Sequence, residues 1–543
     1  MKRKPSAPVF KPYTQAQASL IPPSWEELIP ADHLVRVVNR AIESINLEPL
    51  LRKYKGGGTS SYHPGMMLKV LVYAYTQRIY SSRQIAKVVR ENVNFLWLSG
   101  GNQPDFRTIN AFRGEKMKGV IEAVFTLVLE LLIEEGYVKL ENYFVDGTKV
   151  EANANRHKVV WAKSRAKYEQ RLKEQVKALL KEIEAVNEAE NAEYGDKDLE
   201  EMGGGEGINA EKLEKKIAEL NQRLREQPED KQLAQAVKKM ETDYLPRQKR
   251  YEEQERKLVG RNSYSKTDED ATFMRMKEDR GAEKPLPKPA YNIQTGTEGQ
   301  FVVGFSLHPR AGDTTCLIPH LEGVRANLAA IARRKPHLLT RPGEQAPHCL
   351  PRNLSADAGY GSEENYGYLE EYQLGNYVKY STFHREQQKH RKSELVRKAL
   401  FRSENLPYDP EKDAFICPAN QRLTYRDTAH EKSEHGYVAE VRHYEASACS
   451  TCPLKPECTQ AKGNRHMRVS FRLRQFREQA KANLLSEQGL TLRVQRNVEV
   501  ETFFGQVKHN MRFRRFSLRG FEKVKTEWGI VCIAHNLKKL AAS

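Results

Sequence analysis

Three acidic residues stand at positions from which they could bind one pair of metal ions. Asp146 ends the apolar run at 143–145, Asp357 follows the segment 354–356, and Glu501 lies in a segment with helical periodicity. One carboxylate at each of two strand ends and a third on a late helix could hold two divalent cations against a phosphodiester. Carboxylate oxygens favour Mg²⁺ or Mn²⁺, two per active site, over zinc.

The helix that carries Glu501 is expected to bring a lysine to the same site. Lys508 follows Glu501 by about two helical turns and shares a stripe with Asn497 and Gly505. We expect Lys508 to hold a phosphate beside the metals while Glu501 binds one of them. A neighbouring apolar stripe should dock this helix on a sheet; it consists of Val500, Phe504 and Val507.

Other acids compete for the same roles. Asp313 follows a predicted strand and is the alternative for the second acid of the site. Asp268 and Asp270 are expected in a loop or at a helix N-cap. Glu499 lies about 160° from Glu501 around a helix, so we expect it at the surface or beside DNA and not as a ligand.

Four cysteines fall in one region with the spacing of a metal site. Cys449 and Cys452 form a C-x-x-C pair, Cys417 precedes them by about thirty residues, and Cys458 follows. Four thiolates suit a closed, structural Zn²⁺ site, whose role would be to fold a small polar region. The alternative is four reduced thiols without a metal.

Size and charge favour a large protein that binds a polyanion. The 543 residues are too many for one core and predict about three or four domains. The 89 Lys and Arg against 71 Asp and Glu give a net charge of +18, and the basic residues become denser toward the C-terminus. Such a charge favours nucleic acid. The alternative is a basic surface kept for solubility.

Nothing in the sequence favours a membrane or an export route. The N-terminal Met-Lys-Arg-Lys is not followed by the apolar core of a signal peptide. The longest apolar stretch, 120–133, is interrupted by Glu122 and Glu130 and is too short to span a bilayer. Seven cysteines, an odd number, favour reduced thiols. We therefore expect a cytoplasmic, nucleoid-associated protein.

The first quarter of the chain has helical periodicity. After a tail at 1–24, a helical DNA-binding domain is predicted at 25–140. Its segment 104–113 carries Arg107 and Arg113 and could be the second helix of a helix-turn-helix. The alternative is an ordinary helical bundle with a charged face.

The pattern then changes to strands, and we expect a mixed sheet flanked by helices. The predicted strands are 142–150, 291–295, 301–307, a short one before Asp357, and 376–380. This α/β core would comprise 141–160 and 260–384, with the basic C-terminal helices at 476–543 completing it.

Two insertions are expected within that core. Residues 161–259 carry apolar residues at alternating steps of four and three, and Gly203–Gly205 would separate two arms, which predicts an inserted antiparallel coiled-coil hairpin. Residues 385–475 hold the four clustered cysteines and are expected to form a zinc-knuckle insertion.

Basic residues interleaved with aromatics follow Lys508. Phe513 and Phe516 alternate with arginines, which suits phosphate contact with aromatic packing. The alternative is a segment with a packed aromatic side and a hydrated basic side. The residues expected to contact DNA are Arg107, Arg113, Arg496, His509, Asn510, Arg512, Arg514, Arg515 and Arg519.

Taken together, several motifs resemble those of DDE transposases of bacterial insertion sequences. The resemblance extends over essentially the whole chain, including both insertions. It is carried by Tyr-Phe-Val-Asp-Gly-Thr-Lys-Val-Glu-Ala-Asn-Ala-Asn (143–155), Ser-Lys-Thr-Asp-Glu-Asp-Ala (265–271), Ala-Asp-Ala-Gly-Tyr-Gly-Ser-Glu-Glu-Asn-Tyr (356–366), Val-Glu-Thr-Phe-Phe-Gly-Gln-Val-Lys-His-Asn (500–510), Arg-Phe-Arg-Arg-Phe-Ser-Leu-Arg-Gly (512–520) and the segment 104–113.

The resemblance implies an RNase H-like core with Asp146, Asp357 and Glu501 as its catalytic acids. It also implies binding to terminal inverted repeats, cleavage at the element ends and joining of the freed 3′ hydroxyls to target DNA. One departure concerns the Tyr and Arg that the wider family often has seven and four residues before the glutamate. Here Val494 and Asn497 stand there, and Arg496 is expected on a different helix face.

The expected partner is double-stranded DNA, both the terminal repeats and the target. Because two element ends must be processed, a homodimer on DNA is expected, with the coiled coil as a candidate interface. Two alternatives remain: a DNA-binding protein that keeps the fold without the chemistry, and an RNase H-like nuclease without strand transfer.

Overall fold

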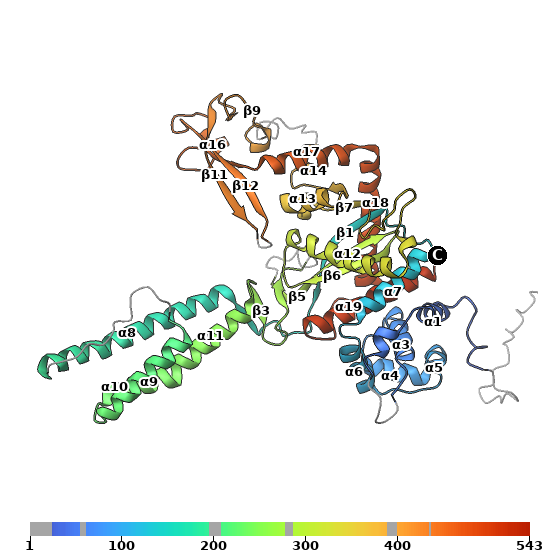
Figure 1. Ribbon diagram of the computed structural model, residues 1–543, viewed down its shortest axis with the longest axis horizontal. Coiled ribbons are helices and arrows are strands. Elements are labelled where there is room, and N and C mark those ends of the chain that lie inside the picture. Colours follow the sequence, from blue (N-terminus) through green and yellow to red (C-terminus); the bar gives the residue numbers. More distant parts are fainter. Residues whose placement is uncertain (1–23, 55–60, 195–207, 277–285, 388–398, 434–435) are drawn as a thin grey trace, which may run out of the picture.

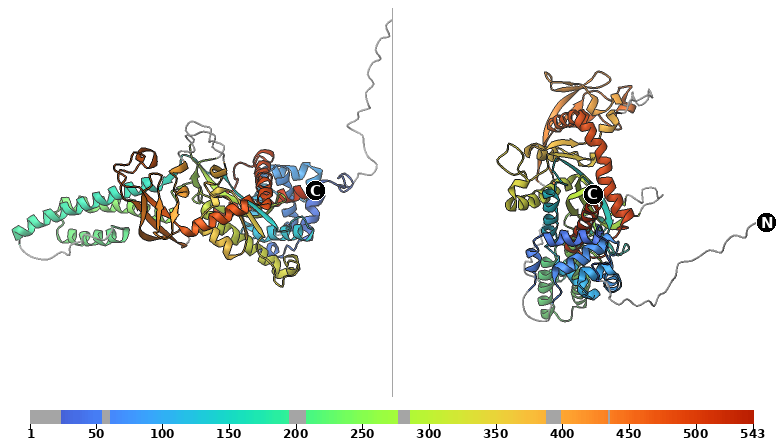
Figure 2. Two further views of the ribbon diagram at one scale, coloured as in Figure 1. Left: turned by 90° about the horizontal axis from the view of Figure 1, so that it is seen from above. Right: turned by 90° about the vertical axis from the view of Figure 1, so that its right-hand side faces the viewer.

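The computed structural model describes residues 24–54, 61–194, 208–276, 286–387, 399–433 and 436–543. Figure 1 shows a central α/β body with the N-terminal helices packed beside it. A helical arm and a small domain with its own sheet project from this body, and the two further views show the same projections (Figure 2). Gly203–Gly205, predicted to separate two helical arms, lies outside the described residues.

A mixed sheet forms the centre of the body, as predicted. β1 pairs antiparallel with β5 and parallel with β7, β7 pairs parallel with β8, and β4 and β6 pair antiparallel with β5. The strand order is β4-β5-β1-β7-β8, with β6 beside β5. The strands are β1 (Asn142–Glu151), β4 (Thr272–Met274), β5 (Lys288–Glu298), β6 (Phe301–His308), β7 (Asn353–Ala356) and β8 (Gly375–Val378).

Helices cover both faces of this sheet. α12 (Leu317–Arg334) packs on one face, where His320 shares a hydrogen bond of 2.8 Å with the Tyr143 hydroxyl. α18 (Glu487–Gly505) crosses β1, β5 and β7 on the other face. α17 (Phe471–Leu485) leads into α18, and α13 (Glu363–Glu371) and α14 (Phe383–Gln387) flank β8. β1 therefore presents alternate side chains to α12 and to α18.

The N-terminal helices share one hydrophobic core with the central body. α3 is buried along most of its length and packs against α19 (Phe521–Leu540). A single cluster of buried side chains runs from Val35 of α1 to Leu537 of α19. The helices are α1 (Leu34–Ser44), α2 (Glu48–Leu51), α3 (Pro64–Thr76), α4 (Ser82–Glu91), α5 (Val93–Ser99), α6 (Phe106–Ala111) and α7 (Ile121–Glu134).

Within the described residues, the inserted arm contains four α-helices, where the sequence analysis predicted a hairpin of two arms. α8 (Ala162–Tyr194) packs against α11 (Leu245–Leu258), and α9 (Ala210–Glu226) packs against α10 (Lys231–Lys239) and α11. The expected return helix is broken after Glu226, because Asp230 accepts a hydrogen bond from Leu233 N and starts a new helix there. The a/d residues still form the arm's own core, separate from that of the body.

The small projecting domain is an antiparallel sheet that the sequence analysis did not predict. Its strand order is β13-β12-β11-β10-β9, around a core that includes Phe415 and Tyr444. The strands are β9 (Tyr408–Asp409), β10 (Ala414–Ile416), β11 (Arg422–Lys432), β12 (Val438–Ala446) and β13 (His466–Val469), with the short helix α16 (Lys455–Cys458) between the last two. Among the described helices, none combines the length and apolar character that crossing a membrane requires.

Candidate active site

Asp146 and Asp357 are brought together by the parallel pairing of β1 and β7. Val145 is the register partner of Ala356, so the residues that follow them emerge side by side. The Oδ1 atoms of both aspartates point to the same guanidinium, that of Arg496, at 3.8 Å from Nη2 for Asp146 and 3.6 Å from Nη1 for Asp357. Two carboxylates that are far apart in the chain thus surround one position that holds positive charge.

Glu501 lies on α18, on the same face of the sheet as Arg496. Its side chain is exposed. Lys379, directly after β8, interacts electrostatically with both Glu501 and Asp357, and its ammonium is 3.9 Å from Asp357 Oδ1. Burial and then Arg496 lower the pKa of Lys379, while Asp357 and Glu501 act in the opposite direction. Residues from β1, β7, β8 and α18 therefore converge at this edge of the sheet, and the assignment of the three acids as one catalytic triad stays a prediction.

Arg496 does not lie where the sequence analysis expected it. It is 4% exposed, and its Nε is buried without a hydrogen-bond partner among the described residues. Leu492, Arg496, Val500 and Phe504 follow one another at four-residue steps and are all buried, so Arg496 belongs to the sheet-facing stripe of α18. The side of α18 that faces the sheet is wider than predicted and includes Arg496. The sequence analysis had placed Arg496 on another face of the helix, in contact with DNA.

Glu499 was expected at the surface, and it is instead turned toward the β5–β6 turn. Its Oε2 accepts hydrogen bonds from Thr297 Oγ1 at 3.2 Å and from Gln300 N at 2.6 Å. Burial raises the pKa of the Glu499 carboxyl. Glu499 therefore anchors α18 to the sheet, while Glu501, two residues later, is turned to solvent.

Lys508 lies in a π-helical turn (Gln506–Asn510) that directly follows α18. Met511 N donates to Gln506 O at 2.7 Å, five residues back, in place of the four of an α-helix. The wider turn rotates Lys508 relative to the stripe of an ideal helix, so its alignment with Glu501 differs from the predicted one. The space around Gly505 is open, because a β-carbon added there would meet no described atom within 4 Å.

Asp313, the alternative second acid, lies on the opposite face of the sheet from Asp146. Its Oδ1 accepts hydrogen bonds from Asn292 Nδ2 at 2.8 Å and Gln294 Nε2 at 3.0 Å. A β-carbon at Gly147 would lie 2.5 Å from the same oxygen, so only glycine fits after Asp146. Because adjacent residues of a strand point to opposite faces, Asp313 supports β1 from below while Asp146 faces α18.

The residues predicted to contact DNA differ in accessibility. Arg113 is 3% exposed: it donates to the Tyr75 hydroxyl at 2.9 Å and to Tyr80 O at 2.7 Å, and its Nη1 is 4.0 Å from Glu527 Oε1. It is an internal tie between the N-terminal helices and α19, so its prediction as a DNA contact was wrong. Exposed are Arg107, His509, Asn510, Arg512, Arg514, Arg515 and Arg519.

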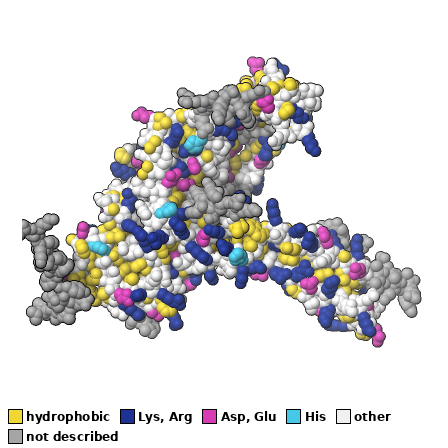
Figure 3. All heavy atoms as spheres, turned by 180° about the vertical axis from the view of Figure 1, so that it is seen from behind, with side chains coloured by type: hydrophobic (Ala, Val, Ile, Leu, Met, Phe, Trp, Pro, Cys, Tyr) yellow, Lys and Arg dark blue, Asp and Glu magenta, His cyan; other side chains and the backbone are white. Residues whose placement is uncertain are grey.

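Several of the exposed arginines also hold the C-terminal segment against the end of β1. Arg515 donates to Ala152 O and Ala154 O at 3.2 Å, and Arg519 donates to Asn153 O at 2.6 Å. The interleaved Phe513 and Phe516 are buried, as the packed-side alternative requires. In the rear view, Lys and Arg side chains are spread over the body and the arm (Figure 3).

The four clustered cysteines line one small cavity of 20 Å³. Backbone N–H groups donate to two of the sulfurs, Gln421 N to Cys417 Sγ at 3.3 Å and Arg465 N to Cys449 Sγ at 3.4 Å, and Arg465 Nη1 donates to Cys458 Sγ at 3.0 Å. Across the part of the chain that the structure describes, no three His, Cys, Asp or Glu side chains form a preformed metal cluster. This holds for the cysteines and for the acids around Arg496.

Comparison with known proteins gave two family matches. The family model described as Transposase DDE domain matches residues 416–541, and that described as Transposase domain (DUF772) matches residues 23–115. No curated protein and no solved structure matches the chain. The first match includes α18 with Glu501, and the second covers the N-terminal helices up to Arg113. Two transposase models thus match separate parts of one chain, and together they support a DDE transposase of an insertion sequence.

Proposed function

We propose that this protein is a DDE transposase that binds the terminal inverted repeats of its element, cleaves DNA at the element ends and transfers the 3′ hydroxyls to target DNA. The observation that carries the proposal is the convergence of Asp146 and Asp357, from adjacent parallel strands, on the sheet face that α18 covers. The strand order β6-β5-β1-β7-β8, antiparallel up to β1 and parallel after it, supports an RNase H-like core.

Asp146, Asp357 and Glu501 are the residues that would hold the metals. Two Mg²⁺ or Mn²⁺ ions bound there supply charge stabilisation to the attacking and leaving oxygens of a phosphoryl transfer. The chain's own residues fit such ions, because both aspartate oxygens already lie within 4 Å of the Arg496 guanidinium, a cation in the same place. The Arg496 guanidinium offsets the negative charge of the two aspartates. When metal ions bind, it would have to move away or share the aspartate oxygens with them.

Cations around the acids would bind the DNA. Lys379 is buried beside Asp357, and Lys508 follows Glu501 in the open π-helical turn. An ammonium at each place can hold a phosphate oxygen of the scissile strand as a point charge. The exposed arginines of 512–519 would extend the contact along the backbone. A homodimer would supply one such site to each element end, with the helical arm as the candidate interface.

Glu501→Gln and Glu499→Gln form a matched pair that tests the proposal. In cleavage of a duplex that carries the element's ends, with Mg²⁺ or with a chelator, wild type should cut only with metal. Glu501→Gln should lose cutting and joining and retain DNA binding, because a neutral amide is a poor ligand for a hard cation. Glu499→Gln should remain active, because Glu499 faces the β5–β6 turn.

Each result of this assay has a definite reading. Equal activity of wild type and Glu501→Gln would remove Glu501 from the site. Loss of cleavage in Glu499→Gln but not in Glu501→Gln would show that Glu499, and not Glu501, is the acid of the site. Tight binding without cutting by wild type would favour a DNA-binding protein that has kept the fold, and cutting without joining would favour a nuclease.

We also propose that Cys417, Cys449, Cys452 and Cys458 hold a structural Zn²⁺. Their thiols share one cavity, and the N–H donors around them would stabilise thiolates, as the outer shell of a zinc site does. Bound there, the ion would tie the loop before β11 to the turn around α16 and so fix the projecting domain.

Replacing Cys449 and Cys452 together by serine should remove the metal. Elemental analysis of the wild type purified without chelator should give about one zinc per chain, and the double variant should give none. Limited proteolysis should then cut within 399–469 of the variant while the body stays intact. Cys349→Ser, which lies outside the cavity, is the control and should keep its zinc. A wild type without zinc would contradict the site.

A further inference from the structure

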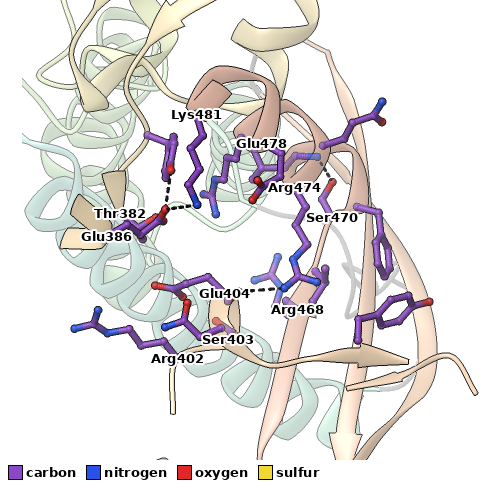
Figure 4. A pocket seen from close by; sticks show the side chains of 18 of the residues that line it. Thr382, Glu386, Arg402, Ser403, Glu404, Arg468, Ser470, Arg474, Glu478 and Lys481 are labelled. Atoms are coloured by element: carbon purple, nitrogen blue, oxygen red, sulfur yellow. Dashed lines mark hydrogen bonds and ion pairs between the residues drawn. The ribbon is translucent and has the colours of Figure 1, made fainter. Parts of the chain in front are cut away.

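A second basic site lies beside the acids, in a cleft of 910 Å³ between α17 and the segment 399–409. Figure 4 shows Glu478 and Lys481 of α17 on one side and Arg402, Ser403 and Glu404 on the other. The cleft opens where the central body meets the projecting domain, and neither family resemblance nor catalysis assigns it a role. Its size and lining are those of a binding site rather than of a packing gap.

Charge in the cleft favours an anion. Six cationic side chains and three carboxylates are among the described residues that line it. The carboxylates are largely occupied: Glu386 accepts from Tyr380, Thr382 and Lys481, and Glu404 pairs with Arg385. The cations are Arg385, Arg402, Arg468, Arg474, Arg477 and Lys481.

Two of these arginines have donor groups that no described residue pairs with. Within the described residues, the Arg402 guanidinium makes no hydrogen bond or ion pair, and Arg477 Nε is buried without a partner. The Arg474 guanidinium stacks over the Phe415 ring, 4.9 Å from its centroid. Burial and the nearby Arg477 lower the pKa of Arg474, while Glu478 acts in the opposite direction. Arg385, Arg468 and Lys481 are paired with carboxylates. Arg402 and Arg477 therefore supply the positive charge of the cleft that an anion could pair with.

The form of the cleft selects a single nucleic-acid strand. Its volume is that of a pocket for a compact ligand, about 300–1,000 Å³, which admits a few nucleotides and not a duplex. Tyr408 and Phe471 line it as partly buried rings beside the arginines. Grooves that bind single strands combine a basic floor with aromatic platforms for the bases in this way.

Position connects the cleft to the acids. Lys379 reaches Asp357, and the next residue, Tyr380, lines the cleft. α17, which forms one wall, leads directly into α18 with Arg496 and Glu501. We infer that the cleft binds the single-stranded segment of DNA that leaves the acid site at an element end. This inference rests on the proposed function for the presence of such a strand.

The test compares two DNA duplexes of about 20 base pairs, one with blunt ends and one with a single-stranded tail of about six nucleotides. A tail of this length lies within the usual site size of a groove that binds single strands. Affinities of the full-length protein are measured without Mg²⁺ as a function of salt. Wild type should bind the tailed duplex more tightly. In the double variant Arg402→Gln with Arg477→Gln that advantage should disappear, and the salt slope for the tailed duplex should fall by about 1.4, or 0.7 for each lost phosphate contact.

Two further variants control for charge and folding. Arg422→Gln with Arg426→Gln removes two exposed arginines from β11 outside the cleft and should keep the tail advantage. Glu478→Gln removes an acid from the cleft and should increase the advantage, a gain that misfolding cannot produce. An unchanged tail advantage in the Arg402/Arg477 variant would overturn the inference, as would its loss in the β11 control.

Inorganic pyrophosphate as competitor separates a strand site from a small-anion site. Binding of pyrophosphate that the Arg402/Arg477 variant loses, together with an unchanged tail advantage in that variant, would assign the cleft to small anions and overturn the inference. The acid variants separate it from the proposed function. If Glu501→Gln loses cleavage and the cleft variant binds as wild type, only the cleft inference fails; if the cleft variant loses the tail advantage and Glu501→Gln still cuts, only the catalytic assignment fails.

Discussion

Substitution of Asp146 by asparagine is expected to slow metal-dependent DNA cleavage by about a thousandfold or more. A bound metal supplies several kcal/mol of transition-state stabilisation, and each 1.36 kcal/mol is about tenfold in rate. Asparagine keeps the shape of the side chain and an oxygen that can accept from Gly147 N, as Asp146 Oδ1 does at 2.8 Å. Lost activity would therefore report a lost charge and ligand, measured as the single-turnover cleavage rate, with DNA affinity unchanged.

Asp313→Asn is the matched control, on the opposite face of the same strand. One amide oxygen can still accept from Asn292 and Gln294, so the support beneath Gly147 is largely kept. This variant should cleave within a few-fold of wild type. A large loss in Asp313→Asn with little effect of Asp146→Asn would show that the wrong aspartate has been assigned to the site.

Replacement of Glu527 by alanine is expected to cost about 3–5 kcal/mol of folding free energy, the usual result of breaking a buried ion pair from one side. Glu527 is fully buried and accepts hydrogen bonds from Ser517 N, Leu518 N and the Tyr75 hydroxyl, with Arg113 at 4.0 Å. Its loss would strand a guanidinium that is itself 3% exposed. The N-terminal helices, α19 and the 512–520 segment would lose their shared anchor.

Chemical denaturation followed by tryptophan fluorescence measures this effect, because Trp528 is buried next to Glu527. Glu522→Ala, at an exposed position in the first turn of the same helix, is the control and should cost less than about 1 kcal/mol. Similar unfolding midpoints for Glu527→Ala and wild type would show that the buried network adds no net stability and that Arg113 finds other partners.

The sequence by itself predicted the strands that carry Asp146 and Asp357, while their role as catalytic acids stays a prediction. The apolar run before Asp357 predicted a strand end correctly, because β7 ends at Ala356. Asp146 was also expected at a strand end and instead lies within β1, which continues to Glu151 through its pairing with β5. Both strands lie at the centre of one sheet. The stripe of Val500, Phe504 and Val507 predicted the buried side of the last helix correctly. These features depend on local periodicity, two residues per repeat in a strand and 3.6 in a helix, which a sequence records directly.

The tertiary structure decided which polar residues meet. Arg496 and Arg113 look like surface arginines in the sequence. Both are buried, because each lies within 4.0 Å of a carboxylate from a distant segment of the chain. The π-helical turn at Lys508 and the break after Glu226 depend on single local hydrogen bonds that periodicity does not reveal, one accepted by the backbone of Gln506 and one by the side chain of Asp230. The cleft beside Tyr380 exists only because α17 and the segment 399–409 face each other across it. The ion pairs of the two arginines and the walls of the cleft join residues remote in the chain, and local patterns carry no information about them.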